Sequence, residues 1–210
     1  MSALTLHDYE LDDGCYKVRL LMGMLALPYT KVAVDVYPGR EQQSAQYLQL
    51  NPLGTLPILA DSEVLLHGAE AILAYLARKY DPKQLWLPSE PTAFGAVMQW
   101  LGFAGGELRC AALARLHHML EVDADANAVD RASRQAFRIM DDHLTLREFD
   151  DGKWFVAETP TIADIALFPA ITLSRDFGIE HDEYPALRRW MRRIRAIPGF
   201  ITMPGIPAYH

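Results

Sequence analysis

Residues 12–18 read DDGCYKV, which places two carboxylates directly before a thiol. The residues that follow have helical spacing, so Cys15 would lie in the first helical turn, where the dipole lowers the pKa of a thiol. Such a thiol could form mixed disulfides. Asp12 and Asp13 oppose this chemistry, because a like charge about 5 Å away at an effective dielectric of about 20 costs on the order of 3 kcal/mol. Both a reactive thiol and an inert, packed one therefore remain open for Cys15.

A structural role also explains an acid at this place. We predict that Asp13 is the N-cap of the helix, since its carboxylate can accept hydrogen bonds from first-turn N–H groups and its charge suits the helix dipole. Asp12 then needs no role beyond that of an exposed loop acid. No Ser or Thr occurs between Thr5 and Thr30, so Tyr9, Cys15 and Tyr16 are the nearby hydroxyl and thiol groups.

Hydrophobic spacing predicts the elements that position this segment. LTLHDY, residues 4–9, indicates a strand, and the next helix carries apolar residues at i, i+3, i+4 and i+7 from Val18 until Pro28 ends it. TKVAVDV, residues 30–36, alternates and predicts a second strand, which a short polar helix over 41–50 follows.

Two short apolar runs on either side of Asp61 and Ser62 predict a β-hairpin. A helix comes next, because apolar residues from Ala69 onward again keep helical spacing. The first 80 residues therefore read β-α-β-α-β-β-α, which predicts an α/β domain over 1–80.

Residues 81–91 contain three prolines and are predicted to be a linker, and the period beyond it, over 92–210, is helical. In TPTIADIALF, Thr161 can cap a helix while Asp164 reaches back to the Thr161 N–H, which is a capping box. A last amphipathic helix has one apolar face formed by Leu187, Trp190, Met191 and Ile194. The second domain is therefore predicted to be all-helical.

Five stretches in this order resemble the cytosolic glutathione transferase family, bacterial type. They are CYKVRLLMGMLALPY, NPLGTLPIL, AEAILAYLARKY, TPTIADIALFP and YPALRRWMRRIRAIPGF, and they span almost the whole chain. The resemblance implies a thioredoxin-like N-terminal domain, an all-α C-terminal domain and, usually, a homodimer. It also implies glutathione as co-substrate and a pocket for an electrophile between the domains.

The resemblance assigns the glutathione site to particular residues. A cis bond at Leu56–Pro57 would present the Leu56 backbone to the cysteinyl unit of glutathione as a short added strand. The helix start at His67–Gly68 would offer N–H groups to the γ-glutamyl carboxylate. Arg40 is a further candidate for cofactor binding. Family members usually have a serine where this chain has Gly68, and a cationic His67 could replace part of its effect.

The family commonly has a Ser, Tyr or Cys that donates to the sulfur, and the Ser-type position falls near Asp12, so Asp12 and Asp13 stand in the catalytic region together with Gly14 and Cys15. Catalysis would then depend on the helix dipole and on the backbone N–H groups of Gly14 and Cys15. The resemblance places the substrate pocket near Tyr9 and near the first helices after the linker, where the candidates are Trp100, Phe103, Arg109 and His117.

Composition narrows the function classes further. The chain has 210 residues and a net charge of −7, which disfavours a nucleic-acid-binding surface. Two cysteines form no disulfide framework and indicate a reducing, cytoplasmic location. Neither a secretory signal nor a membrane span is expected, and no metal-ligand spacing occurs.

The sequence therefore predicts a glutathione transferase-like enzyme that uses an electrophile or a disulfide. Two alternatives stay open: a non-catalytic protein of the same fold that acts in binding, and an enzyme that uses a different thiol ligand.

Overall fold

The computed structural model describes residues 4–206, and its first strand lies inside a four-stranded sheet of order β2-β1-β3-β4. Leu4, Leu6 and Asp8 of this strand are buried, while Thr5 and His7 between them are half-buried. Strand β1 pairs in parallel with β2, where Leu6 lies opposite Lys31, and antiparallel with β3, where Leu6 lies opposite Leu59. The antiparallel pairing of β3 with β4 is the predicted hairpin.

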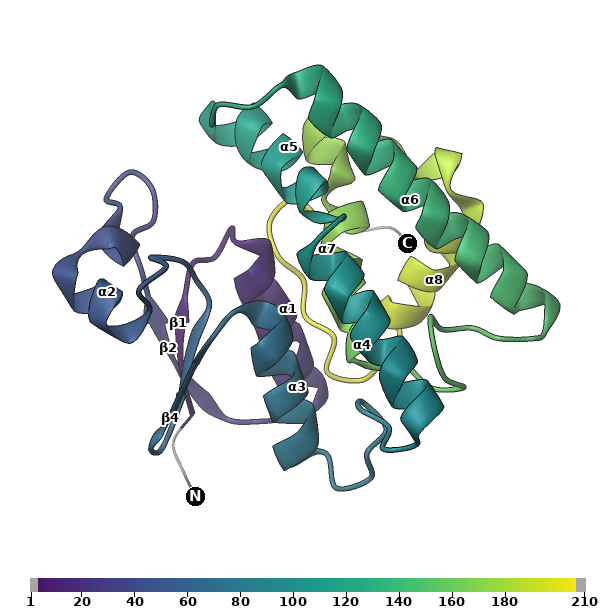
Figure 1. The fold of residues 1–210 in the computed structure, drawn as a ribbon, viewed down its shortest axis with the longest axis horizontal. Helices are drawn as coiled ribbons and strands as arrows, with labels where there is room; N and C mark the ends of the chain where they lie inside the picture. The colour runs from purple at the N-terminus through teal and green to yellow at the C-terminus, as the bar shows by residue number, and fades with distance from the viewer. Residues whose placement is uncertain (1–3, 207–210) are drawn as a thin grey trace.

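The predicted order of elements in the first domain is confirmed. It contains β1 (Leu4–Asp8), α1 (Asp13–Met24), β2 (Tyr29–Ala33), the 3-10 turn η1 (Glu41–Gln43), α2 (Ala45–Leu50), β3 (Ile58–Asp61), β4 (Val64–His67) and α3 (Ala69–Tyr80). Figure 1 shows the sheet with α2 on one side and with α1 and α3 on the other. Helices α1 and α3 face the second domain, so their N-terminal ends lie near the interdomain boundary.

Two local predictions differ from the structure. The strand predicted over 30–36 ends at Ala33, although the Val34 N–H still donates to the Asp8 carbonyl. The helix predicted over 41–50 is divided in two, because Ser44 has extended backbone angles and its hydroxyl caps α2. Amphipathic spacing does not reveal such a break, since a cap depends on one residue's dihedral angles.

The second domain is all-helical, as predicted. It contains α4 (Pro91–Gly105), α5 (Arg109–Leu120), α6 (Ala126–Phe149), α7 (Ile162–Thr172), the 3-10 turns η2 (Ser174–Phe177) and η3 (His181–Glu183), and α8 (Pro185–Arg195). Helix α7 is buried along almost all of its length and packs against α1 and α3 of the first domain as well as against α4 and α8. One continuous core therefore joins the two domains.

The capping box at the start of α7 is confirmed. Asp164 accepts from the Thr161 N–H at 2.8 Å, and the Thr161 hydroxyl accepts from the first turn. Trp190 of α8 donates its indole N–H to the same buried Asp164 carboxylate at 2.8 Å. The box thus fixes the start of α7 and connects it to α8.

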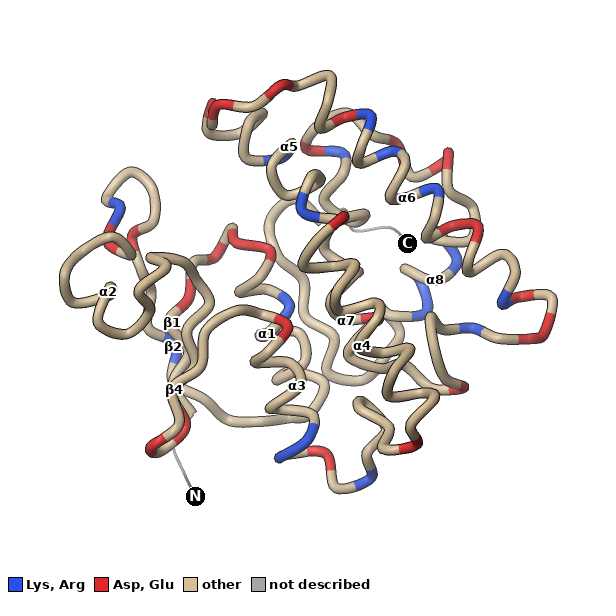
Figure 2. Tube along the Cα trace, viewed as in Figure 1, with Lys and Arg blue, Asp and Glu red and all other residues tan. Residues whose placement is uncertain are grey.

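Charged residues of both signs are spread over the surface (Figure 2). Three arginines of α8 form ion pairs with acidic side chains. Arg189 and Arg193 both pair with Glu148 of α6, and Arg188 pairs with Asp182. These ion pairs partly neutralise the positive charge of α8.

Candidate functional site

The N-cap of α1 is Asp12, not Asp13 as predicted. The Asp12 carboxylate accepts a hydrogen bond from the Cys15 backbone N–H at 2.6 Å, and its backbone angles are extended, as a cap requires. Asp13 is instead the first helical residue. The error arises because two adjacent carboxylates have equal propensity for the cap position.

The Asp12 carboxyl group has a raised pKa. Burial, followed by the negative charge of Asp13, raises the pKa of Asp12 from its usual value of 3.8 to about 6. The hydrogen bond from the Cys15 N–H opposes the shift without cancelling it. At neutral pH Asp12 is therefore mainly ionised, but it takes up a proton at a higher pH than an ordinary aspartate does.

Cys15 is a buried residue, with an exposed fraction of 0%. Its sulfur accepts a hydrogen bond from the Tyr9 N–H at 3.4 Å. Burial, followed by the charge of Asp12, raises the pKa of the thiol well above its ordinary value. These surroundings oppose the thiolate that the catalytic role suggested for Cys15 would need. The neighbouring Tyr16 is also unavailable, because its buried hydroxyl donates to the Ile201 carbonyl.

Gly14 marks the place where three segments of the first domain meet. A β-carbon at Gly14 would lie 3.2 Å from Pro57 Cδ, 3.6 Å from Ala69 Cβ and 3.1 Å from a carboxylate oxygen of Asp12. The start of α1, the loop before β3 and the start of α3 are therefore in contact. Backbone groups from all three segments can act together only because residue 14 has no side chain.

Leu56 and Pro57 lie on the loop before β3, and the bond between them is cis, as predicted. Pro57 is buried and Leu56 is half-buried. Within residues 4–206 the Leu56 N–H has no hydrogen-bond partner. A backbone donor with no partner, directly before the residue that packs against Gly14, is suited to pairing with an extended peptide.

The start of α3 adds a second set of backbone donors. Gly68 caps α3 with a φ of 85°, a left-handed conformation that glycine adopts without strain, and a β-carbon there would meet no atom within 4 Å. His67 is the last residue of β4 and is exposed. The first N–H groups of α3, from Ala69 onward, have no intrahelical partners, and such groups can bind an anion.

An ion pair lies beside these two helix starts. Lys17 of α1, which is buried, donates to Glu70 of α3 at 3.0 Å. Burial alone would lower the pKa of Lys17, but the charges of Asp13 and Glu70 outweigh it and raise the pKa. Lys17 therefore stays cationic and offsets part of the negative charge at the start of α1.

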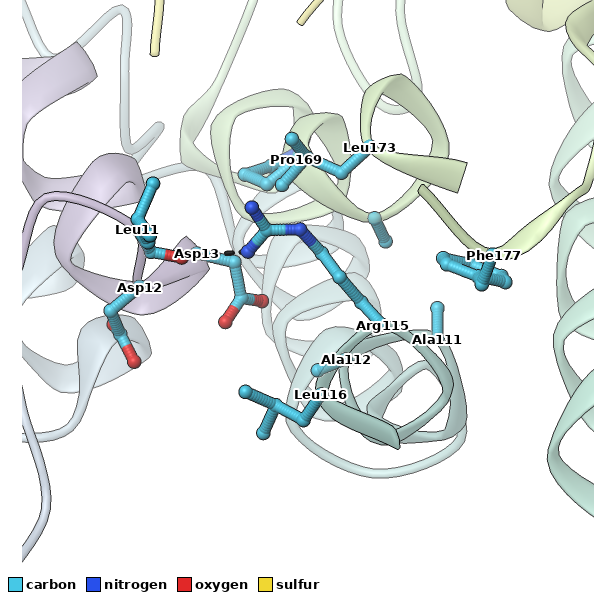
Figure 3. A pocket seen from close by; sticks show the side chains of 11 residues that line it. Leu11, Asp12, Asp13, Ala111, Ala112, Arg115, Leu116, Pro169, Leu173 and Phe177 are labelled. Atoms are coloured by element: carbon cyan, nitrogen blue, oxygen red, sulfur yellow. Dashed lines mark hydrogen bonds between the residues drawn. The ribbon is translucent and has the colours of Figure 1, made fainter. Parts of the chain in front are cut away.

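A cavity lies between the two domains, next to Asp12 and Asp13 (Figure 3). Its first-domain wall is formed by Leu11, Asp12 and Asp13. Its second-domain wall is mostly apolar and is contributed by α5, by the end of α7 and by η2, with Leu116, Pro169 and Phe177 among its residues. A hydrophobic substrate in this cavity would lie directly beside the start of α1.

Arg115 of α5 is the one basic residue among those that line the cavity, within the described part of the chain. Its Nε donates to Asp176 and its Nη1 to the Leu11 carbonyl, both at 2.6 Å. The sequence analysis missed this residue. A usable signal was present, because Arg115 falls at i+4 from the buried Ala111 on the apolar stripe of α5.

The other predicted pocket residues lie elsewhere. Trp100 packs in an aromatic cluster with Phe103, His143 and Phe155, and together with Phe103 it lines a separate hollow on α4 and α6. Arg109 is exposed at the start of α5, and the His117 ring lies 2.8 Å from the Val122 carbonyl.

Tyr9 and Arg40 also lie outside the cavity wall. Tyr9 follows β1 and contacts Cys15 through its backbone, and Arg40 is exposed on the loop after β2. The structure thus brings together the predicted residues of α1, the Leu56 loop and α3, but it does not bring Tyr9, Arg40 or the four second-domain candidates to the cavity.

Metal-ligating clusters and membrane-spanning helices are both absent from residues 4–206. No group of three or more His, Cys, Asp or Glu side chains could hold a metal ion. No helix in that range is long and apolar enough to cross a membrane.

Comparisons with known proteins cover both domains. Residues 6–84 match the family model described as the N-terminal domain of glutathione S-transferase, and residues 105–198 match its C-terminal domain model. The chain is 29% identical over 202 residues to the glutathione S-transferase GstB of Escherichia coli K12, covering 91% of this chain and 92% of the relative.

It is also 28% identical to the disulfide-bond oxidoreductase YfcG of the same organism, covering 88% of this chain and 86% of the relative. Among solved structures, a glutathione transferase homologue from Drosophila mojavensis with bound glutathione superimposes with a TM-score of 0.84 at 25% identity, covering 94% of this chain and 90% of that one.

Proposed function

The chain belongs to the glutathione S-transferase family, and we propose that it binds glutathione on its first domain and adds the glutathione thiol to an electrophile held between the domains. The contact of Gly14 with Pro57 and Ala69 carries the proposal, because it places the start of α1, the Leu56 loop and the start of α3 at one point. A small extended peptide with a terminal carboxylate and a thiol fits that set of groups.

Each part of glutathione has a suitable partner in this arrangement. The Leu56 backbone pairs with the cysteinyl unit, and the first N–H groups of α3 bind the γ-glutamyl carboxylate with help from the Lys17 charge. His67 and Gly68 border that carboxylate site. Arg40, which is exposed on the loop after β2, stays a candidate for the remaining carboxylate.

The sulfur would lie at the start of α1. The Cys15 N–H is already bonded to Asp12, so the Asp13 and Gly14 N–H groups are the donors left in the first turn within residues 4–206. Together with the helix dipole they stabilise a thiolate, while the Asp12 carboxylate opposes it. The thiolate then attacks an electrophile in the neighbouring apolar cavity.

Thiol–disulfide exchange is the second candidate, because one relative is named a disulfide-bond oxidoreductase. The raised pKa of the buried Cys15 thiol argues against exchange through the protein's own cysteine. Exchange in this chain would instead run through the sulfur of bound glutathione, at the same site.

Titration calorimetry at neutral pH tests the proposal. Wild type is expected to bind glutathione in the micromolar to low-millimolar range. Leu56→Pro should abolish this binding because it deletes the backbone N–H, whereas Leu56→Ala keeps the N–H and should stay within about threefold of wild type, a difference below 1 kcal/mol.

An absence of binding in wild type at tens of millimolar would overturn the proposal in favour of a non-catalytic protein or of another thiol ligand. Equal affinities of wild type and a folded Leu56→Pro variant would overturn the placement of the cysteinyl unit.

We further propose that the protein is a cytoplasmic homodimer. Both cysteines are free, which suits a reducing compartment, and a hollow on α4 and α6 lined by Trp100, Phe103 and Ile139 offers an apolar surface for a second copy. Sedimentation equilibrium should give twice the mass of the chain, and Ile139→Glu should shift it to a monomer. A monomeric wild type would contradict this assembly.

A further inference from the structure

The guanidinium of Arg115 lies inside the wall of the interdomain cavity. Its exposed fraction is 5%, and Figure 3 shows it between the Leu11–Asp13 segment and Pro169. Two of its nitrogens are occupied, Nε by Asp176 and Nη1 by the Leu11 carbonyl. Arg115 is thus held in place from both sides.

Its third nitrogen, Nη2, is buried and has no hydrogen-bond partner within the described residues. In Figure 3 this nitrogen is directed towards Pro169, which also lines the cavity. A buried donor without a partner is costly, and most such donors in folded proteins are satisfied by protein or by ordered water. The ion pair and the backbone contact explain the other two nitrogens but leave Nη2 unexplained.

The charges around the cavity restrict what an acceptor for Nη2 can be. The Arg115 charge is already matched by Asp176 at 2.6 Å, and Asp12 and Asp13 add negative charge to the opposite wall. An anionic electrophile would be repelled there. The remaining wall is apolar, so a neutral oxygen acceptor on a largely hydrophobic molecule fits the site best.

We propose that Arg115 selects the electrophile by donating its free Nη2–H to the carbonyl oxygen of an uncharged α,β-unsaturated carbonyl compound. This inference rests on the proposed function. In the reaction the glutathione thiolate forms a carbon–sulfur bond to the β-carbon. The carbon–carbon π electrons shift to the bond between the α-carbon and the carbonyl carbon, and the carbonyl π electrons move onto the oxygen, which gives an enolate. The Arg115 N–H stabilises that oxygen, and the α-carbon then takes a proton from solvent, which balances the proton lost by the thiol.

Two unreactive product analogues test the inference in the intact protein. S-oxobutyl glutathione carries a methyl ketone, and S-isopentyl glutathione has a methyl group in place of the ketone oxygen. Wild type is expected to bind the ketone about tenfold more tightly, because a hydrogen bond from a charged donor is gained. S-carboxyethyl glutathione should bind less tightly than the ketone.

Two variants distinguish recognition of the ketone oxygen by Arg115 from a purely structural role of Arg115. Arg115→Lys keeps the positive charge but replaces the planar three-nitrogen fork with a single nitrogen and so lacks Nη2, so the ketone preference should fall to about one while glutathione affinity is kept. Asp176→Asn disturbs the ion pair but leaves Nη2, so the preference should remain about tenfold. A structural clamp alone would make both variants behave alike.

The outcomes distinguish the inference from the proposed function. Glutathione binding with equal affinity for the ketone and isopentyl conjugates in wild type overturns the inference alone, even if neither variant folds. Tighter binding of the carboxyethyl conjugate overturns the preference for an uncharged electrophile. Failure to bind glutathione and all three conjugates overturns the proposed function and the inference with it.

Discussion

The Asp12 carboxylate accepts a 2.6 Å hydrogen bond from the backbone N–H of Cys15, at the helix start where we propose that the sulfur of glutathione binds. The Cys15 N–H is therefore bonded to the cap and is not available to the sulfur. The negative charge of Asp12 would also repel a glutathione thiolate beside it. Asp12 stabilises α1 and at the same time opposes thiolate formation.

We predict that Asp12→Ser makes the thiol of bound glutathione more acidic. Serine caps a helix about as well as aspartate, carries no charge and can donate a hydrogen bond to sulfur. Removing the charge should lower the pKa of the bound thiol by roughly one to two units. Ultraviolet absorbance of the thiolate, followed against pH, measures this shift directly, and conjugation at neutral pH should rise with it.

Asp12→Asn is the matched control, because it removes the charge and keeps the size of the side chain. It should lower the pKa of the bound thiol in the same direction. An unchanged thiol pKa in both variants would mean that the sulfur lies away from Asp12.

The raised pKa of Asp12 also predicts a pH-dependent change in stability. The folded protein holds the Asp12 proton more tightly than the unfolded chain, with a pKa of about 6 against the usual 3.8. The folded state therefore loses stability as pH rises through this window and regains it below the window. Asp12→Asn should melt at a higher temperature than wild type at pH 7 to 8.

The advantage of Asp12→Asn should shrink as pH falls from about 6 to about 4, the range set by the two pKa values, because wild type becomes protonated there. Thermal melts of both proteins across that range measure the difference. A constant difference at all pH values would assign the effect to packing rather than to ionisation.

Gly14→Ala is expected to weaken glutathione binding more than it changes stability. Alanine favours a helix over glycine by about 0.5–1 kcal/mol, which offsets the close contacts of the new β-carbon. That atom would lie 3.2 Å from Pro57 Cδ and would press on the loop that carries Leu56. Calorimetry should show an affinity for glutathione lower by about fivefold, or about 1 kcal/mol.

Gly95→Ala is the control for this substitution, because a β-carbon at Gly95 of α4 meets no atom within 4 Å. It should raise the melting temperature slightly and leave glutathione affinity unchanged. If Gly14→Ala binds glutathione like wild type, the three segments that meet at Gly14 do not form the binding site.

Much of the fold was predictable because it follows from repeated patterns. The apolar stripe that begins at Val18, the hairpin around Asp61 and the capping box at Thr161 each involve several residues that agree. The cap of α1 was misplaced by one residue because it depends on the angles of Asp12 alone.

The cavity was harder to predict, since its walls come from segments far apart in the sequence. Arg115 acquires its role only through Asp176, Leu11 and the packing of α5 on the first domain. Helical spacing placed Trp100 and Phe103 on a helix but gave no information on which neighbour they face. In the structure they face an aromatic cluster.

The reactivity of the buried Cys15 thiol can be tested by chemical labelling. Cys15 lies three residues before Val18 on the buried face of α1, and both burial and the charge of Asp12 raise the pKa of its thiol. We therefore predict that native protein reacts with one equivalent of a maleimide, at the half-buried Cys110, and with two after unfolding. Cys110→Ser should remove the native reaction, whereas Cys15→Ala should retain it.

Cys15→Ala should also keep glutathione-dependent activity within about twofold, while losing about 1 kcal/mol of stability from the cavity left in the core. Mass spectrometry of labelled peptides and steady-state rates measure both effects. Native labelling at Cys15, or loss of activity in a folded Cys15→Ala variant, would indicate that the Cys15 thiol takes part in the reaction. Retained activity would leave the helix start, with its Gly14 N–H and its Asp12 charge, as the element that sets the reactivity of the sulfur.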